Sequence, residues 1–302
     1  MGKIKAWISA ARLRTLPLSV SGILLGTALA NYAGFSDGLI FSLAIATTIT
    51  FQITSNFAND YGDGIKGTDN EQRIGPKRAL QSGLLTKREL KLGIIICAAI
   101  SFCLTVFLVY ISFGPEKIGY ILLFLVLGIL SIWASLRYTM GDSPYGYRGL
   151  GDVFVFLFFG ILSVLGTKFL YAKQINSLDF LPAIAVGFLC VGVLNLNNLR
   201  DFESDKHHSK NTLIVKIGFE KGKKYHYTLL FLAFLSFTMY TFFNFKSLVS
   251  SMYLLFFVPI FFHVLKVLRT SEPKLLDPEL KKLALSTFFT ALAFYFTINY
   301  FS

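Results

Sequence analysis

Long apolar stretches alternate with short polar segments along the whole chain of 302 residues. A bilayer core about 30 Å thick needs roughly 20 apolar residues in a helix, and stretches of this length recur throughout the sequence. We predict nine membrane-spanning helices, at residues 17–35, 41–58, 92–113, 118–136, 152–171, 180–198, 226–245, 249–268 and 283–301. The expected fold class is an all-α polytopic membrane bundle, with residues 1–302 forming one integral-membrane domain and the lipid bilayer as a partner.

The segment before the first stretch has a different pattern. Within residues 3–15 the apolar side chains are interspersed with basic ones: Ile4, Trp7, Ile8 and Leu13. A short segment of this kind, followed by Pro17, is typical of a helix that lies in the membrane interface. We therefore predict an N-terminal interfacial helix on the inner leaflet.

Composition supports a membrane protein and excludes several other classes. Hydrophobic residues make up 54% of the chain, charged residues only 15%, and the mean hydropathy is +0.60. Cys97, Cys103 and Cys190 lie within apolar stretches without the spacing of a zinc site, so we expect small core side chains. The net charge of +12 does not indicate nucleic-acid binding, because membrane-length apolar stretches separate the basic residues.

The basic residues also predict the orientation of the helices, because cytoplasmic loops of membrane proteins collect Lys and Arg. All but four of the 29 Lys and Arg residues fall on one side of the predicted spans. The four exceptions are Lys117, Lys168, Lys173 and Lys246. We expect a multi-pass protein of the cell membrane, with a cytoplasmic N-terminus and an external C-terminus.

A first polar cluster lies at residues 56–69, at the inner end of the second stretch. Four of its members fall on one helical face: Asn56, Asn59, Asp60 and Asp63. Two glycines follow and permit the chain to turn, so that Asp69 could fold back towards the same face.

A second cluster lies at the inner end of the sixth stretch, where Asn198, Asp201 and Asp205 share one helical face. Carboxylates at a membrane boundary repel one another and are costly to desolvate, so two such faces need a compensating partner. Mg²⁺ prefers oxygen ligands and binds through a few carboxylates together with substrate phosphates. The two clusters therefore predict Mg²⁺ bridging a diphosphate, although one cluster alone could be a solvated helix end with ordinary salt bridges.

Basic residues close to both clusters are candidates for binding the diphosphate. They are Arg73, Lys77 and Arg78 after the first cluster, with Arg200 and Lys206 beside the second. Arg matches phosphate geometrically, and Lys serves as a point charge. The bias of inner loops towards positive charge is the alternative explanation for these residues.

The loop between the fourth and fifth stretches is rich in Gly and Tyr. Tyr138, Tyr145 and Tyr147 offer ring faces and hydroxyls to an aromatic guest, and Arg148 can pair with an acid group, with Asp152 to orient it. We predict an aromatic acceptor site here, while an aromatic belt at the membrane interface remains the alternative.

Together these segments resemble the UbiA superfamily of intramembrane prenyltransferases, which have nine helices and two Asp-rich motifs. The sequence N-D-Y-G-D-G-I-K-G-T-D at 59–69 is similar to the form found in the branch that prenylates 1,4-dihydroxy-2-naphthoate, in which the third Asp follows a glycine. Segments 11–17, 144–152, 197–205 and 212–218 fit the same branch. The resemblance covers about residues 7–220, and the last three spans match only as hydrophobic helices.

The resemblance implies Mg²⁺-dependent transfer of a polyprenyl group from polyprenyl diphosphate to 1,4-dihydroxy-2-naphthoate, with loss of CO₂, giving demethylmenaquinone. It also implies that Asp60, Asp63, Asp201 and Asp205 are the catalytic carboxylates that hold Mg²⁺. Asp69, Asn56 and Asn198 are further candidate ligands.

Two alternatives remain open at this point. The first is a related prenyltransferase for another aromatic acceptor, such as 4-hydroxybenzoate. The second is an ion transporter whose carboxylates line a permeation path, although a transporter places such groups near the middle of the membrane, whereas these lie at one interface.

Overall fold

The computed structural model describes residues 2–68, 74–245 and 247–301, which contain helices and no strands. Its helices are α1 (Lys3–Ala11), α2 (Leu16–Tyr32), α3 (Gly38–Ile65), α4 (Lys87–Phe113), α5 (Ile118–Arg137), α6 (Gly151–Val155), α7 (Thr167–Ala172), α8 (Phe180–Arg200), α9 (Phe202–His207), α10 (Leu213–Ile217), α11 (Phe219–Asn244), α12 (Phe257–Arg269) and α13 (Asp277–Tyr300). Shorter 3₁₀ segments are η1 (Leu13–Thr15), η2 (Tyr145–Arg148), η4 (Ser177–Asp179), η5 (Leu248–Phe256) and η6 (Pro273–Leu276), and η3 (Phe156–Gly166) is a π-helix.

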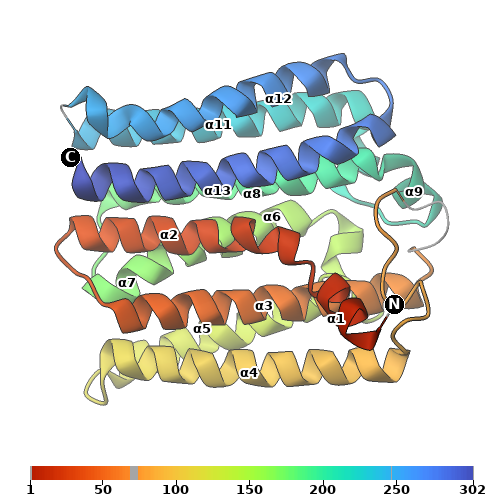
Figure 1. The fold of residues 1–302 in the computed structure, drawn as a ribbon, viewed down its shortest axis with the longest axis horizontal. Helices are drawn as coiled ribbons and strands as arrows, with labels where there is room; N and C mark the ends of the chain where they lie inside the picture. Colours follow the sequence, from red (N-terminus) through yellow and green to blue (C-terminus); the bar gives the residue numbers. More distant parts are fainter. Residues whose placement is uncertain (1, 69–73, 246, 302) are drawn as a thin grey trace.

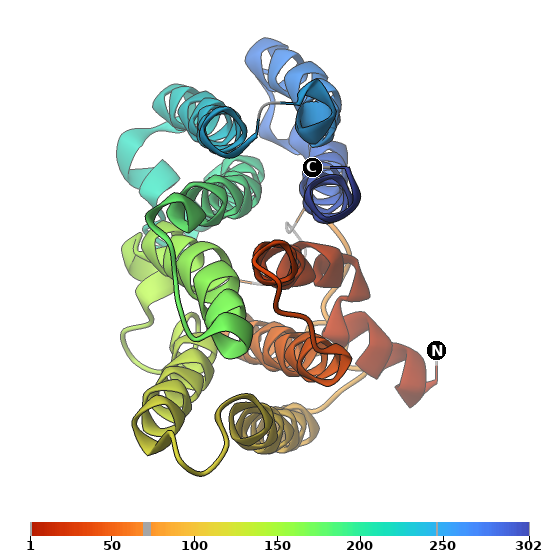
Figure 2. The ribbon, with the colours of Figure 1, turned by 90° about the vertical axis from the view of Figure 1, so that its left-hand side faces the viewer.

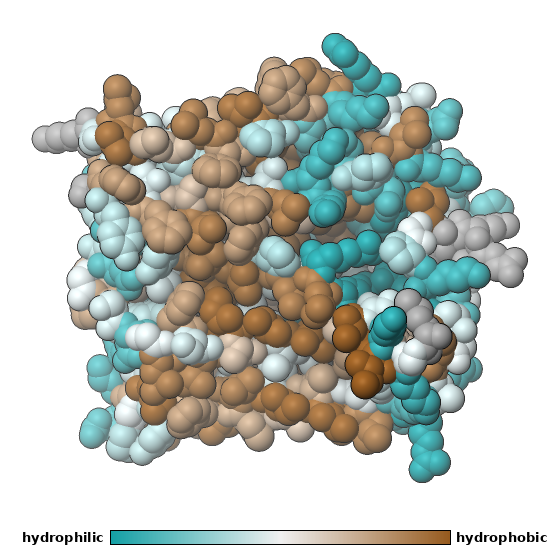
Figure 3. Space-filling view, in the orientation of Figure 1, coloured by the Kyte–Doolittle hydropathy of each residue, from teal (hydrophilic) through white to brown (hydrophobic). Residues whose placement is uncertain are grey.

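The long helices run roughly parallel to one another in one bundle (Figures 1 and 2). Within the described residues, nine segments are long and apolar enough to cross a membrane, and they correspond to the nine predicted stretches. Hydrophobic side chains cover the middle of the bundle, while hydrophilic ones gather mainly at the end that carries α9 and the N-terminus (Figure 3). The predicted fold class is therefore confirmed.

The N- and C-termini lie at opposite ends of the bundle (Figure 1). The end that carries α1, α9 and the last turns of α3 and α8 is called the carboxylate end below, because both acidic clusters lie there.

Several helices extend beyond the predicted apolar stretches. The second predicted span ended at residue 58, whereas α3 continues to Ile65 and so carries the first acidic cluster on regular helix. The seventh began at residue 226, whereas α11 begins at Phe219. The cause is general: hydropathy marks the part of a helix inside the bilayer, but backbone hydrogen bonding continues into polar residues.

The fifth span is irregular, because α6, η3 and α7 follow one another without a break and the middle part is π-helical. This segment packs closely on α8. A Cβ at Gly160 would lie 2.6 Å from the Cα of Gly187, so both positions need glycine for the two helices to approach this far.

The N-terminal helix packs beside the carboxylate end (Figure 1). Arg12 adopts a left-handed conformation with φ of 50° and separates α1 from η1. The Trp7 ring packs edge-on against Phe57 of α3, with ring centroids 5.2 Å apart. Asn56 donates hydrogen bonds to the Ala11 carbonyl at 2.8 Å and to the Thr15 hydroxyl at 3.1 Å, which fixes the turn between α1 and α2.

All three cysteines are free thiols, but they differ in burial. Cys190 is buried, Cys97 is half-buried and Cys103 is exposed. The predicted core position is therefore wrong for Cys103, because this face of α4 points out of the bundle.

Candidate active site

The two acidic clusters approach each other around one lysine. Asp63 lies on the last turn of α3 and Asp205 on α9. The Nζ atom of Lys210 is 3.9 Å from Oδ1 of Asp63 and 3.8 Å from Oδ1 of Asp205. One ammonium group thus lies between carboxylates that are more than 140 residues apart in the sequence.

Asp63 has a further partner from the loop after α5. The Tyr147 hydroxyl donates to Oδ1 of Asp63 at 2.8 Å and also hydrogen-bonds the Thr68 hydroxyl at 2.6 Å. Gly62 permits this contact, because a Cβ there would lie 2.6 Å from Oγ1 of Thr139. The absence of a side chain at residue 62 lets α3 meet the loop that carries Tyr147.

Asp205 is almost completely buried, and among the described residues its Oδ2 atom has no hydrogen-bond partner. Burial raises the pKa of Asp205 to about 7, with an opposing effect from Lys210 and a smaller increase from Asp201. For Lys210, burial acts to lower the pKa, but the carboxylates of Asp63 and Asp205 outweigh it and the pKa is raised. Lys210 therefore stays charged, while Asp205 has an oxygen available to a cation.

Asp60, one turn before Asp63, has a different set of contacts. Its carboxylate is fully buried and accepts the backbone N–H groups of Ala79 at 3.1 Å and Leu80 at 3.3 Å. These two bonds hold the loop between α3 and α4 against α3.

The carboxylate of Asp201 is also bound by a neighbouring residue. Arg200 donates to both of its oxygens, through Nε at 2.7 Å and Nη2 at 2.6 Å. The same guanidinium reaches Asp277 at the start of α13 at 2.8 Å and Asn197 at 2.8 Å. Arg200 is buried and therefore anchors α8 on α13, so its predicted contact with a diphosphate would require these bonds to rearrange.

The two candidate asparagines are both buried. Asn56 uses its amide nitrogen to hold Ala11 and Thr15, and its Oδ1 accepts from Gln52 at 3.1 Å. Asn198 lies on α8, one turn before Asp201. Asn56 thus supports the N-terminal segment in this structure, and its role as a metal ligand remains a prediction.

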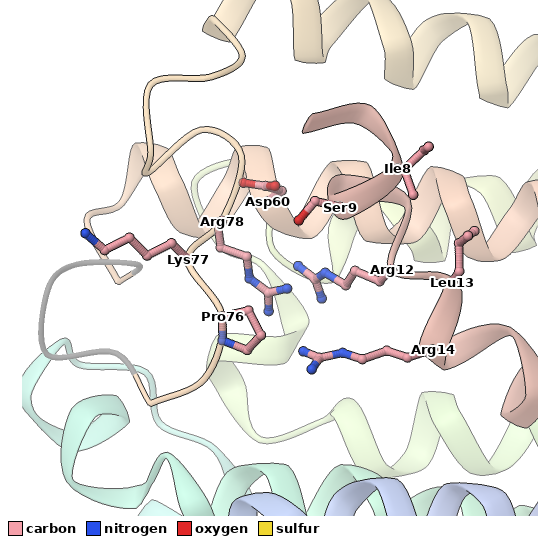
Figure 4. A pocket seen from close by; sticks show the side chains of 9 residues that line it. All are labelled: Ile8, Ser9, Arg12, Leu13, Arg14, Asp60, Pro76, Lys77 and Arg78. Carbon is pink, nitrogen blue, oxygen red and sulfur yellow. The ribbon is translucent and has the colours of Figure 1, made fainter. Parts of the chain in front are cut away.

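A pocket of about 260 Å³ opens beside Asp60 (Figure 4). Arg12 and Arg14 from the N-terminal segment and Arg78 from the loop after α3 direct their guanidinium groups into one region, whereas the Lys77 side chain points away (Figure 4). Of the predicted phosphate ligands, Lys206 is exposed on α9. Arg73, like the candidate metal ligand Asp69, lies outside the described residues.

The tyrosines of the loop after α5 separate into two groups. Tyr147 contacts Asp63, and burial raises the pKa of Tyr138 to about 12, so its hydroxyl stays protonated. Tyr145 instead donates to the Ala134 carbonyl at 2.9 Å and stacks on Phe154 with ring centroids 3.9 Å apart. Arg148 is exposed.

Asp152, at the start of α6, is buried, and its Oδ1 atom has no hydrogen-bond partner among the described residues. Asp152 and Asp205 are thus two carboxylates at this end of the bundle that each have one buried oxygen without a hydrogen-bond partner among the described residues. A buried oxygen of this kind is suited to accept a hydrogen bond from a polar guest.

Sequence reasoning missed three cations of this site. Lys210 was counted only among the basic residues of the inner side, and Arg12 and Arg14 only as part of the interfacial segment 3–15 and of the motif segment 11–17. Their shared signal is position: Lys210 follows the second cluster by five residues, and both arginines precede the first span directly.

The residues present fit a hard divalent cation. The atoms at the junction that could bind a metal are the carboxylate oxygens of Asp63 and Asp205, which now contact the ammonium group of Lys210, and Asp205 has a second, buried oxygen without a partner among the described residues. In the part of the chain that the structure describes, no three acidic, histidine or cysteine side chains converge into a complete metal site. That arrangement suits Mg²⁺, which takes few protein carboxylates and completes its shell with water and phosphate.

Comparison with known proteins agrees with this architecture. The chain is 42% identical to 1,4-dihydroxy-2-naphthoate octaprenyltransferase of Haemophilus influenzae, over 94% of this chain and 92% of that protein. It is 39% identical to the Escherichia coli protein of the same name, over 97% of this chain and 95% of the relative.

Two solved structures share the fold at low sequence identity. A UbiA homologue from Aeropyrum pernix superposes with a TM-score of 0.71 at 15% identity, covering 93% of this chain and 97% of that one. A UbiA homologue from Archaeoglobus fulgidus, bound to DMAPP and Mg²⁺, gives 0.59 at 16% identity, covering 93% and 98%. The model of the UbiA prenyltransferase family matches residues 19–296, which confirms the resemblance seen in the motifs, and the chain belongs to that family.

Proposed function

We propose that this protein transfers a polyprenyl group from polyprenyl diphosphate to 1,4-dihydroxy-2-naphthoate, with Mg²⁺ as cofactor and with loss of CO₂, giving demethylmenaquinone. The names of the relatives at 42% and 39% identity support the acceptor and the reaction. The Mg²⁺ bound to the Archaeoglobus homologue supports the cofactor.

One observation carries the proposal: Asp63 and Asp205, from the two separate clusters, lie on either side of Lys210. A polar junction of this kind at the end of an apolar bundle suits a substrate whose head is a polyanion and whose tail is a hydrocarbon. The tail would stay among apolar side chains while the diphosphate reaches the carboxylate end.

Bound Mg²⁺ would withdraw negative charge from the leaving diphosphate and so ease the breaking of its bond to the prenyl group. Asp63 and Asp205 are the best-placed ligands, because they come from the two separate clusters and contact the same lysine. Asp60 and Asp201, together with Asn56, Asn198 and Asp69, remain proposed ligands whose contribution would require some of the contacts described above to be exchanged.

The pocket beside Asp60 is the proposed diphosphate site. Arg12, Arg14 and Arg78 converge there, and guanidinium groups bind phosphate oxygens in pairs. Lys210, which contacts both Asp63 and Asp205, would add a further positive charge. Arg73, Lys77, Arg200 and Lys206 remain secondary candidates.

The acceptor is proposed to bind beside the loop after α5. Tyr147 places its hydroxyl on Asp63, and Tyr138 lies near the same junction with a hydroxyl that stays protonated. Arg148 is the proposed partner of the naphthoate carboxylate, and Asp152 has an oxygen that can accept a hydrogen bond from a ring hydroxyl. Tyr145 would support this loop through its contacts with Ala134 and Phe154.

We further propose that the carboxylate end faces the cytoplasm and that the whole chain works as one membrane domain. The clustering of basic residues at this end and the position of the termini at opposite ends of the bundle support this orientation.

The test is prenyl transfer by purified protein in detergent. A polyprenyl diphosphate is offered with 1,4-dihydroxy-2-naphthoate or with 4-hydroxybenzoate, with and without Mg²⁺, and product and CO₂ are measured. We expect metal-dependent product and CO₂ with the naphthoate. If product forms with 4-hydroxybenzoate and not with the naphthoate, prenyl transfer is retained as the reaction but the proposed acceptor is wrong. No product with either acceptor would overturn the proposal.

A further inference from the structure

A second polar network, separate from the contacts of Lys210, is buried between four spans. It joins Asn195 of α8, His226 of α11, His263 of α12 and Glu279 of α13, each no more than 2% exposed. Nδ1 of His226 is 3.0 Å from the Asn195 amide, the two Nε2 atoms are 2.9 Å apart, and Nδ1 of His263 is 2.8 Å from Glu279. One unbroken hydrogen-bond chain therefore connects four spans.

The order of donors and acceptors in this chain is constrained. The chain ends on a carboxylate that accepts only, so His263 donates through Nδ1 and its Nε2 is free to accept. His226 then donates through Nε2, and its Nδ1 must accept a hydrogen bond from Asn195. The amide of Asn195 meets this need when its nitrogen faces His226, an orientation related to the reverse one by a half-turn of the amide.

The surroundings of Asn195 permit that orientation. With the oxygen towards His226, the amide nitrogen of Asn195 is buried without a partner. Turning the amide gives that nitrogen an acceptor, moves the oxygen to the position without a partner, and gives every hydrogen bond of the network one donor and one acceptor. The histidines then need no additional proton, and the charge of Glu279 is balanced by Lys282, whose Nζ lies 2.6 Å away at the surface.

The network is tied to the second acidic cluster. Asn195 lies on α8, which ends at Arg200 directly before Asp201, and Arg200 makes a second connection from α8 to α13 through Asp277. We infer that Asn195, His226, His263 and Glu279 form a proton-ordered clamp that positions α8, and with it Asp201 and Asp205, against the rest of the bundle. The positioning effect rests on the proposed function, whereas the proton order does not.

Few other ionisable groups face the histidines. Glu279 and Lys282 on α13 are the charged groups beside His263, and the Tyr227 ring lies edge-on to His226 with centroids 6.4 Å apart. Lys223, one turn before His226, directs its ammonium group to Glu220 and to the Thr270 carbonyl. A pH effect that a substitution in this network produces can therefore be assigned to the two histidines and their hydrogen-bond partners.

The clamp is tested by changing its polarity with substitutions that keep shape. Asn195→Asp places an acceptor at both ends, so the two Nε2 atoms can stay in contact only if they share an additional proton. The folded variant then binds more protons than the unfolded one, and its stability falls as the pH rises. We expect its folding equilibrium to weaken by up to about tenfold per pH unit relative to the parent protein, measured by thermal unfolding in detergent between pH 6 and 9.

The matched control is the double variant Asn195→Asp with Glu279→Gln. It reverses the direction of donation in every hydrogen bond of the network, because the new Gln amide donates to His263 and the new carboxylate accepts from His226. The double variant should regain the pH dependence of the parent. If Asn195→Asp does not fold at any pH, the same test is whether adding Glu279→Gln restores folding. A double variant that is no more stable than the single variant overturns the proton order.

Positioning is measured separately, as the Mg²⁺ concentration that gives half-maximal binding of a prenyl diphosphate analogue. We expect it to rise about tenfold in Asn195→Asp at pH 8.5 and to return in the double variant. An unchanged value would overturn the positioning role even if the proton order holds. If the parent protein binds no prenyl diphosphate, the proposed function fails while the unfolding data still decide the proton order.

Discussion

The two acidic clusters look alike in sequence but differ in how the fold uses each carboxylate. In the first, Asp60 holds the backbone of Ala79 and Leu80, whereas Asp63 faces Lys210. In the second, Asp201 is held by Arg200, whereas Asp205 faces the same lysine. Each cluster thus has one carboxylate that organises its own surroundings and one that meets the other cluster.

The comparison shows that equal residue types at helical spacing do not imply equal roles. Spacing decides which side chains share a helical face, but the neighbouring elements decide what each side chain contacts. The resulting prediction is an order of importance, with Asp63 and Asp205 ahead of Asp60 and Asp201.

The largest effect is expected from Asp63→Asn and Asp205→Asn. Each removes a charge from the junction where Mg²⁺ is proposed to bind, and loss of one such electrostatic contact costs about 10³-fold in rate. The measurement is kcat/KM for prenyl transfer, with thermal unfolding as a check of folding. Glu203→Gln on α9, which changes an exposed carboxylate, is the matched control and should act like the parent protein. Activity within tenfold of the parent in either junction variant would contradict the assignment.

The next effect is expected from Lys210→Met. Without the ammonium group two buried carboxylates face each other, and breaking a buried ion pair costs about 3 kcal/mol or more. The midpoint of thermal unfolding should fall markedly in EDTA and recover in part with Mg²⁺, which can take over the charge. Lys206→Met, at an exposed position on α9, serves as the control. A midpoint in EDTA equal to that of the parent would show that Lys210 does not stabilise the junction.

A smaller effect is expected from Asp60→Asn and Asp201→Asn. An amide oxygen keeps one of the two accepted hydrogen bonds at each position, so we expect a stability loss of about 1–2 kcal/mol and a loss of activity of about tenfold. Unfolding and kcat/KM are measured on the same preparations. Losses as large as those of Asp63→Asn and Asp205→Asn would mean that all four carboxylates act as equal metal ligands, and would break the comparison.

The smallest effects should separate two tyrosines of one loop. Tyr147→Phe removes the hydroxyl that donates to Asp63, worth about 1 kcal/mol and therefore about fivefold in kcat/KM. Tyr145→Phe removes a bond to the Ala134 carbonyl, away from the junction, and should leave kcat/KM within about twofold. The opposite order would place Tyr145, and not Tyr147, at the reacting groups.

The bundle itself could be predicted from the sequence, because the length of an apolar stretch is set by the thickness of a bilayer. The ends of the helices could not, since α3 and α11 continue beyond the apolar residues into polar ones. The π-helical η3 also had no signal in hydropathy, because its residues are as apolar as those of a regular span.

The candidate site could be predicted only in part. Helical spacing correctly placed Asp60 and Asp63 on one helix, and the resemblance linked the two clusters. The single helical face predicted for Asn198, Asp201 and Asp205 was wrong, because α8 ends at Arg200 and Asp205 lies on the separate helix α9. Lys210 could not be distinguished from the other basic residues of the inner loops, because its place depends on how α3, α9 and the loop after α5 meet. The different surroundings of Tyr145 and Tyr147 depend on the same tertiary contacts.

The central claim is that the two clusters form one site for Mg²⁺ and a prenyl diphosphate, through Asp63 and Asp205. It is tested most directly by calorimetric binding of an unreactive prenyl diphosphate analogue in detergent with Mg²⁺, for the parent protein, Asp63→Asn, Asp205→Asn and the double variant. Residues that act as a unit give non-additive losses in such a cycle. We predict that each single variant loses most of the Mg²⁺-dependent affinity and that the double variant loses little more. Independent, additive losses, or unchanged affinity in either single variant, would contradict a shared site.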